Sequence, residues 1–229
     1  MSTAIVYVDG YNLYYSALRG TAYKWLDLVK LFDLILEAQE ATIDQVHVKF
    51  FTAPAIARYA RNTDHAVQSQ QRYHRALQAL YPDRFSLILG RHHLTQGWLP
   101  QAREGRPVDH GLRHKVWQAE EKLTDVDIAL HFYRDAVKRV ADLLVICSND
   151  TDMVPAMEMV RADCPAQKIA LVAPLPMPSA TAPVRHVASS LEVHAAWTRR
   201  YLRDEELLAA QLPPKIPTRK RPIQKPSYW

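Results

Sequence analysis

Short, mostly apolar segments alternate with longer amphipathic ones along the first 175 residues. The strand-like segments cover residues 4–8, 46–51, 85–89, 143–147 and 169–173. Apolar residues recur at helical spacing in the segments between them, which cover residues 26–41, 64–80, 125–140 and about 151–162. Strands that are apolar at nearly every position are typical of parallel sheets with both faces covered.

This alternation predicts an α/β fold. Because parallel strands are joined by right-handed crossovers, the helices would cover both faces of the sheet. We therefore expect a Rossmann-like, three-layer α/β/α sandwich with a mostly parallel central sheet, formed by residues 1–212 as one domain. Residues 91–111 break the rhythm with three of the six glycines and several charges, which indicates a long loop or hairpin insertion.

Composition narrows the class of protein. No apolar run approaches the roughly 20 residues that a membrane-spanning helix needs, and the N-terminus reads as a strand and not as a leader. The two cysteines, Cys147 and Cys164, cannot build a disulfide framework. We expect a cytoplasmic protein without membrane contact.

The basic character of the chain comes from residues 213–229. This segment holds five Lys or Arg residues, no acidic residue and five of the fifteen prolines. Without it, the 29 basic and 24 acidic residues become 24 of each, so the body is neutral. We expect an extended or disordered tail that serves either as an arm for nucleic acid or another anionic partner, or as a solubilising end.

Aspartates follow two of the predicted strands. Asp9 ends the first, Asp150 and Asp152 follow the fourth, and Asp125 opens a helix. If the two strands are neighbours, these carboxylates converge at the sheet edge where ligands bind. Clustered carboxylates need a compensating cation, and Mg²⁺ or Mn²⁺ suits oxygen ligands. The alternative is that each aspartate caps a helix, which explains any one of them better than the set.

Two polar residues accompany the acids. Asn12 would orient a carboxylate or a metal-bound water, and Ser148 would cap the following helix or contact a phosphate. Asp127, two positions after Asp125 on the predicted helix, would at most support the aspartates that bind the cation and would not bind it directly.

Three blocks in this order resemble the NYN domain family of the PIN-like (FLAP-nuclease-like) superfamily, which includes the LabA-like bacterial proteins. They are residues 9–15 (DGYNLYY), 121–129 (EKLTDVDIA) and 148–155 (SNDTDMVP). Residues 19–28 also resemble a bacterial subgroup. The resemblance covers most of residues 4–53 and 112–175. Asn149 departs from the glycine, and His131 from the aspartate, that members of the family carry there.

The resemblance implies an α/β/α fold with an acidic Mg²⁺ or Mn²⁺ pocket and RNA cleavage. Position by position it implies Asp9, Asp125, Asp150 and Asp152 as catalytic metal-site acids. Basic residues among aromatic ones suit single-stranded RNA, so we expect Arg19, Lys24 and Lys122 to contact the strand. Packing of the aromatic side chains is the alternative for each of them.

We therefore expect a metal-dependent endoribonuclease, with a non-catalytic RNA-binding or scaffold protein as the alternative. A homodimer or a regulatory protein partner stays open. A haloacid-dehalogenase-type phosphatase needs an aspartate where Tyr11 stands, and a flavin or nicotinamide enzyme needs a G-x-G turn, which the chain lacks. No residue pattern supports a pyridine monooxygenase, a label that some relatives of this group carry.

Overall fold

A six-stranded parallel sheet forms the centre of the computed structural model, which describes residues 2–56, 63–179, 184–219 and 221–229. Its strands are β1 (Thr3–Asp9), β2 (Gln45–Thr52), β3 (Phe85–Leu89), β6 (Leu143–Cys147), β7 (Lys168–Val172) and β8 (Trp197–Arg199). They lie in the order β3–β2–β1–β6–β7–β8, and all neighbours run parallel. The predicted parallel sheet is confirmed.

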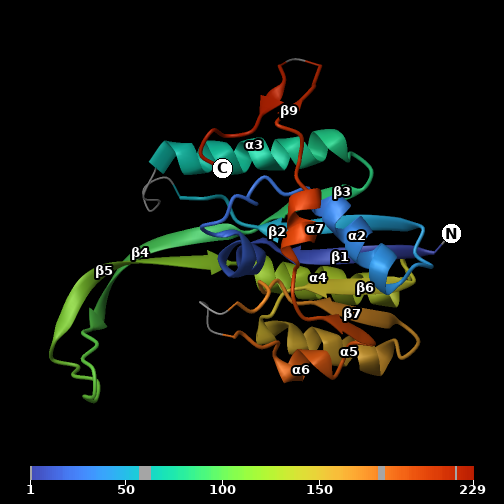
Figure 1. Cartoon of the computed structure of the whole chain (residues 1–229). Coiled ribbons are helices and arrows are strands. Elements are labelled where there is room, and N and C mark those ends of the chain that lie inside the picture. The colour runs from blue at the N-terminus through green and yellow to red at the C-terminus, as the bar shows by residue number, and fades with distance from the viewer. Residues whose placement is uncertain (1, 57–62, 180–183, 220) are drawn as a thin grey trace.

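Helices cover both faces of this sheet (Figure 1). One face packs against α2 (Leu28–Gln39), α3 (Thr63–Leu80) and α7 (Asp204–Ala209), and the other against α4 (Thr124–Val137), α5 (Val154–Asp163) and α6 (Ser189–Glu192). Alternate side chains of β1 pack against the two helix layers. Val6 and Val8 face the layer of α2, α3 and α7, and Tyr7 faces the layer of α4, α5 and α6. The three-layer sandwich predicted from the sequence is confirmed. No helix in the described part of the chain has the length and apolarity to cross a membrane.

The sheet order places the ends of β1 and β6 side by side. Their register pairs Val8 with Cys147, so Asp9 and Ser148 follow at the same edge. From there β1 leads into α1 (Gly10–Leu13) and a π-helical turn (Tyr14–Leu18), whereas β6 leads through a 3₁₀ turn (Thr151–Met153) into α5.

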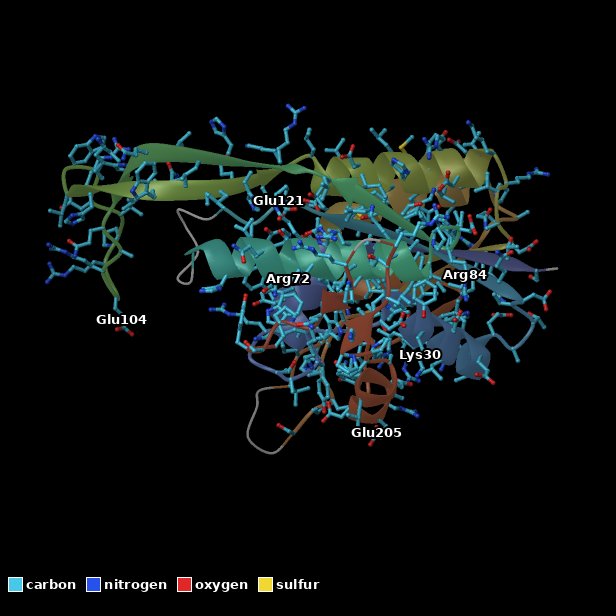
Figure 2. All side chains as sticks on the ribbon, turned by 90° about the horizontal axis from the view of Figure 1, so that it is seen from above. Lys30, Arg72, Arg84, Glu104, Glu121 and Glu205 are labelled. Atoms are coloured by element: carbon cyan, nitrogen blue, oxygen red, sulfur yellow. The ribbon has the colours of Figure 1, made fainter. Side chains whose placement is uncertain are left out.

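A two-stranded antiparallel hairpin projects from the body (Figure 1). It consists of β4 (Arg91–Pro100) and β5 (Arg113–Lys122), which pair only with each other. Residues 91–111, interpreted from the sequence as a loop or hairpin, contribute β4 and the turn region. Figure 2 shows Glu121 near the body and Glu104 at the far end of the hairpin.

The proline-rich segment from Pro213 follows a defined path across α3 (Figure 1). Its strands β9 (Lys215–Ile216) and β10 (Ile223–Gln224) form a small antiparallel pair, and Ile216 and Ile223 are buried in the core. Of the two states expected for this segment, extended or disordered, its described residues include extended strands. The composition suggested disorder because prolines and cations outnumber the few apolar residues that anchor the segment.

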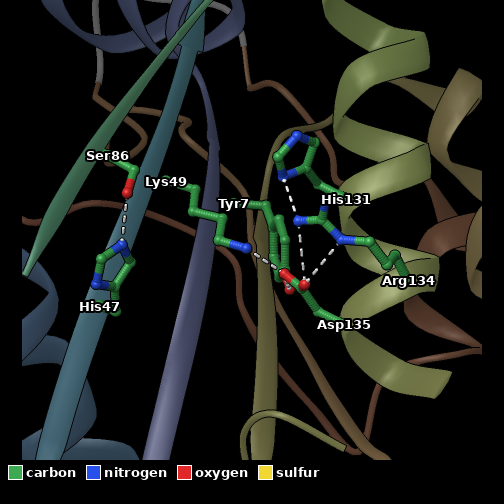
Figure 3. Close-up of polar contacts among 7 residues, drawn as sticks. All are labelled: Tyr7, His47, Lys49, Ser86, His131, Arg134 and Asp135. Carbon is green, nitrogen blue, oxygen red and sulfur yellow. Dashed lines mark hydrogen bonds and ion pairs between the residues drawn. The ribbon is translucent and has the colours of Figure 1, made fainter. Parts of the chain in front are cut away.

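A buried polar network joins α4 to the sheet (Figure 3). The Tyr7 hydroxyl of β1 donates a hydrogen bond of 2.7 Å to Oδ2 of Asp135 on α4, and Lys49 of β2 forms an ion pair with the same oxygen. The Lys49 ammonium also lies 5.5 Å from the centre of the Tyr7 ring. Three elements of the sandwich thus share one buried carboxylate.

Candidate functional site

Asp9 is buried at the end of β1, where it caps α1. Its Oδ1 accepts a hydrogen bond of 2.9 Å from the backbone N–H of Asn12, and its Oδ2 accepts one of 3.1 Å from the hydroxyl of Ser148. Burial raises the pKa of Asp9 from 3.8 to about 6, although both hydrogen bonds oppose this rise. The carboxyl group is therefore poised to change charge near neutral pH.

The other predicted acids lie near Asp9. Asp150 caps its own turn, because its Oδ1 accepts a 3.0 Å hydrogen bond from the backbone N–H of Asp152. Asp125, in the first turn of α4, has its pKa raised by burial and then by the charges of Asp150 and Asp152. Asn12 accepts a 3.1 Å hydrogen bond from the backbone N–H of Asn149 and so links the two strand ends. The sequence correctly placed these residues at one edge.

The prediction of a Mg²⁺ or Mn²⁺ site is wrong. Within residues 2–56, 63–179, 184–219 and 221–229, no three His, Cys, Asp or Glu side chains form a group that could hold a metal ion. Asp9 and Asp150 each use a carboxylate oxygen to cap a turn, the alternative weighed above, because they accept hydrogen bonds from the backbone N–H groups of Asn12 and Asp152.

The remaining predicted residues are separated. Asp127 is half-buried in the first turn of α4, and its N–H donates to the carbonyl of Leu123. Lys122 is exposed and forms an ion pair of 2.7 Å with Glu120. By contrast, Arg19 and Lys24 both line a cavity next to the carboxyl ends of β1 and β2.

This cavity has a volume of about 760 Å³, and nine of its 21 lining residues are aromatic. The rings of Tyr11 and Tyr15 are stacked with centres 5.8 Å apart, and Tyr14 meets Tyr15 edge-on at 5.2 Å. The Arg19 guanidinium lies 5.5 Å from the centre of the Tyr15 ring. The other aromatic residues in the lining are Phe50, Tyr73, His74, His92, Tyr228 and Trp229. Such a lining suits a flat, unsaturated ligand.

The base of the hairpin supplies an acid and a histidine to this cavity. Glu121 and His92 face each other across the β4–β5 ladder and both line the cavity. Nδ1 of His92 lies 2.8 Å from the carbonyl oxygen of Pro54, which can only accept, so the neutral ring keeps its lone pair on Nε2. Burial raises the pKa of Glu121 above 4.5, while a hydrogen bond from Thr124 opposes the rise.

Sequence reasoning missed this pair. His92 carried no interpretable spacing, and Glu121 was noted only as part of a family block. The strand register that brings the two residues together was the missing information, and no periodicity in residues 91–122 reveals it.

Asp9→Asn should remove a pH dependence of stability. The folded state binds the Asp9 proton at a pH of about 6 and the unfolded state near 3.8, so the wild-type free energy of unfolding loses up to about 3 kcal/mol as pH rises across this interval. Urea unfolding at pH 4, 5, 6 and 7 should show the variant gaining stability relative to wild type with rising pH. Asp109→Asn, on the hairpin, serves as the matched control. A difference that stays constant with pH would contradict the burial argument.

Comparison with known proteins adds one informative relative. The chain is 38% identical to the 6-hydroxy-3-succinoylpyridine 3-monooxygenase HspA of Pseudomonas putida, over 98% of this chain and 74% of the relative. A solved protein of unknown function from Vibrio parahaemolyticus shares the fold with a TM-score of 0.51 at 18% identity, over 90% of this chain and 94% of that one. No family model matches the chain, so the resemblance to NYN domains stays a prediction.

The monooxygenase relative corrects the functional prediction. We expected a metal-dependent endoribonuclease, a hydrolase, or an RNA-binding scaffold, and we found no support for a pyridine monooxygenase. A relative this similar over nearly the whole chain is named as an oxidative enzyme, so the ribonuclease prediction is wrong. Binding of RNA, of a second copy or of a regulatory protein stays a prediction.

Proposed function

We propose, because the chain belongs to the family of the 6-hydroxy-3-succinoylpyridine 3-monooxygenase HspA, that it is an oxygenase that hydroxylates a flat heteroaromatic acid. The structural observation that supports this proposal most is the aromatic cavity with Arg19 and Lys24 in its wall. Cys147 and Cys164 are free, which fits a reducing compartment such as the cytoplasm.

The chemistry of the cavity matches the relative's substrate. As its name states, 6-hydroxy-3-succinoylpyridine combines a flat hydroxypyridine ring with a chain that ends in a carboxylate. Rings such as those of Tyr11 and Tyr15 would pack against the heterocycle, and the cations of Arg19 and Lys24 would pair with the carboxylate. A ligand with both a flat ring and a carboxylate would contact both the aromatic and the basic residues of the lining.

Glu121 and His92 would move the proton of the ring hydroxyl. Loss of that proton raises the electron density of a hydroxypyridine ring and so favours attack by an electrophilic oxygen donor. Glu121 is ionised above its raised pKa and can accept the proton, while His92, whose Nδ1 lies against the Pro54 carbonyl, presents Nε2 as a further hydrogen-bonding atom. Because Glu121 and His92 lie where the hairpin joins the body, the proton acceptor is beside the tyrosines of the cavity.

A flavin or nicotinamide dinucleotide does not fit at the β1–α1 turn. Such a group needs open backbone N–H groups at a glycine-rich turn, whereas the Asp9 carboxylate already binds the N–H of Asn12. A Cβ atom on Gly10 would lie 2.7 Å from the carbonyl oxygen of Phe51, so this glycine serves close packing on β2. The negative charges of Asp125 and Asp150 nearby would also repel a pyrophosphate.

Isotope labelling tests the proposed reaction. A monooxygenase places one oxygen atom of O₂ in the substrate and reduces the other to water with two electrons from a reductant. The purified protein should convert 6-hydroxy-3-succinoylpyridine under ¹⁸O₂, with reduced nicotinamide or reduced flavin added as reductant, to a product carrying one ¹⁸O by mass spectrometry. Absence of labelled product with both reductants would contradict the proposal.

Titration calorimetry tests the assignment of the cavity separately. 2-Hydroxypyridine keeps the ring of 6-hydroxy-3-succinoylpyridine but lacks its carboxylate. It should therefore bind about 10-fold or more weakly than 6-hydroxy-3-succinoylpyridine, since charged hydrogen bonds contribute about 1.5–3 kcal/mol. In the Arg19→Ala/Lys24→Ala variant this preference should disappear. A preference that persists in the variant would place the substrate elsewhere.

A further inference from the structure

The segment that we call the strap, residues 213–219 and 221–229, closes one side of the aromatic cavity. Its last two residues, Tyr228 and Trp229, belong to the lining, although they lie more than 200 residues after Tyr11 in the chain. The cavity is therefore lined by residues from both the early and the late parts of the sequence.

The first half of the strap is fixed to the body. The indole N–H of Trp25 donates a 3.0 Å hydrogen bond to the carbonyl of Pro213, and Ile216 and Ile223 are buried in the core. The backbone N–H of Lys225 donates to the carbonyl of Pro214 at 2.9 Å and closes the small hairpin. These contacts hold the strap whether or not the cavity contains a ligand.

The hydroxyl group of Tyr228 links the second half of the strap to α3 by hydrogen bonds. The Tyr228 hydroxyl lies 2.5 Å from the carbonyl oxygen of His65 and 2.6 Å from the hydroxyl of Ser69. Since a carbonyl only accepts, Tyr228 donates to His65 and accepts from Ser69. The tyrosine is thereby oriented although 45% of its surface is exposed.

Trp229 completes an aromatic wall. Its ring centre lies 6.1 Å from that of Trp25, which it meets edge-on, and 5.8 Å from that of Tyr73, to which it is tilted by 58°. Trp25 is fully buried and Tyr73 nearly so, whereas Trp229 is only partly buried and lines the cavity. A ligand in the cavity can therefore contact both Trp229 and Tyr73, whereas Trp25 is not part of the lining.

We propose that the strap determines the specificity of the cavity, with Trp229 as the residue that contacts the flat ring of the substrate and Tyr228 as the residue that positions it. The strap also carries four basic residues and no acidic one, which favours an anionic aromatic ligand over a neutral one. This proposal rests on the proposed function for the identity of the substrate. It assigns a role to a segment that the sequence indicated only as a tail.

Kinetics of Trp229→Ala and Trp229→Phe test the contact. Alanine should raise KM for 6-hydroxy-3-succinoylpyridine roughly 10- to 100-fold with kcat changed less than about 3-fold, because ring packing is lost and the groups that move protons stay. Phenylalanine should restore most of the loss. Trp98→Ala, on the exposed outer part of the hairpin and outside the cavity, is the matched control and should leave KM unchanged. A KM within about 3-fold of wild type for folded Trp229→Ala would overturn the proposal.

Tyr228→Phe keeps the test decisive if Trp229→Ala does not fold. This variant removes only the hydroxyl that joins the strap to α3, so the fold should persist by circular dichroism while KM rises roughly 3- to 10-fold. An unchanged KM would then overturn the positioning role.

Binding of an aromatic anion, which requires no turnover, distinguishes a failure of this proposal from a failure of the proposed function. Where wild type shows no turnover, the dissociation constant of 8-anilinonaphthalene-1-sulfonate takes the place of KM as the readout. Weaker binding by Trp229→Ala and recovery by Trp229→Phe would support the strap while the reaction is wrong. Equal binding by wild type and both variants would overturn the strap proposal alone.

Discussion

Replacement of Lys49 by alanine should lower the free energy of unfolding by about 3–5 kcal/mol, the usual result of leaving a buried charge without its partner. Only 13% of the Lys49 side chain and 5% of the Asp135 side chain are exposed. Burial by itself would raise the pKa of Asp135, but hydrogen bonds from Lys49 and Tyr7 outweigh it and lower the pKa below 3.8. Without Lys49, the buried carboxylate loses its closest cation and keeps only the Tyr7 hydrogen bond and the half-exposed Arg134, 3.4 Å away.

The exposed pair of Lys122 and Glu120 provides the matched control. Both of its side chains are at least half exposed, so Lys122→Ala should cost less than about 1 kcal/mol in urea unfolding at pH 7. Equal losses for Lys49→Ala and Lys122→Ala would contradict our interpretation of the buried network. The double variant Lys49→Leu/Asp135→Leu should recover much of the loss, because it removes both charges together.

The Lys49 contribution should also depend on pH with a defined sign. Because the folded-state pKa of Asp135 lies below its unfolded value of 3.8, the pair stabilises the protein fully above pH 3.8, and this contribution disappears as pH falls through the lower, folded-state pKa. The difference in stability between wild type and Lys49→Ala should therefore shrink in acid.

Glu121→Gln should lower kcat for 6-hydroxy-3-succinoylpyridine by roughly 10²- to 10⁴-fold, the usual contribution of a positioned general base. The amide keeps the size of the side chain and an oxygen that accepts the hydrogen bond from Thr124, so the hairpin base should stay intact. It cannot accept the ring proton. KM should change little, because the aromatic rings and cations that bind the substrate remain.

The pH profile separates this role from a structural one. Wild-type kcat should rise with pH through the raised pKa of Glu121, and the variant should lose that limb. Glu120→Gln changes the neighbouring carboxylate, which lies on the opposite side of the strand and pairs with Lys122, and it should leave kcat unchanged. Equal kcat values for wild type and Glu121→Gln would exclude Glu121 as the base.

The fold was predictable because burial on both faces leaves a simple pattern. The segments that became β1, β6 and β7 are apolar at most positions, and the amphipathic segments that became α2 and α4 show one apolar face each. Neighbouring strand ends then had to bring Asp9 close to Asp150. The sequence could not show that their oxygens bind backbone N–H groups, since capping and metal binding use the same residue in the same place.

The cavity was not predictable, because its walls come from elements without a repeating pattern. His92 and Glu121 meet only through the register of the hairpin, and Trp229 reaches the cavity only because Ile216 and Ile223 anchor the strap. Arg19 and Lys24 were singled out from the sequence as partners of RNA, and the structure places both in the cavity lining. Their real setting became visible only with the tyrosines and the hairpin base around them.

The central position of β1 has a consequence for synthesis on the ribosome. This strand leaves the exit tunnel before the other strands of the sheet, and one of its edges pairs with β2 soon afterwards, but the other edge waits for residues 143–147. Until then a nascent chain carries an open row of backbone donors and acceptors flanked by apolar side chains, the kind of surface that recruits chaperones or aggregates. The hairpin of β4 and β5 lengthens that interval, since its residues are made before β6.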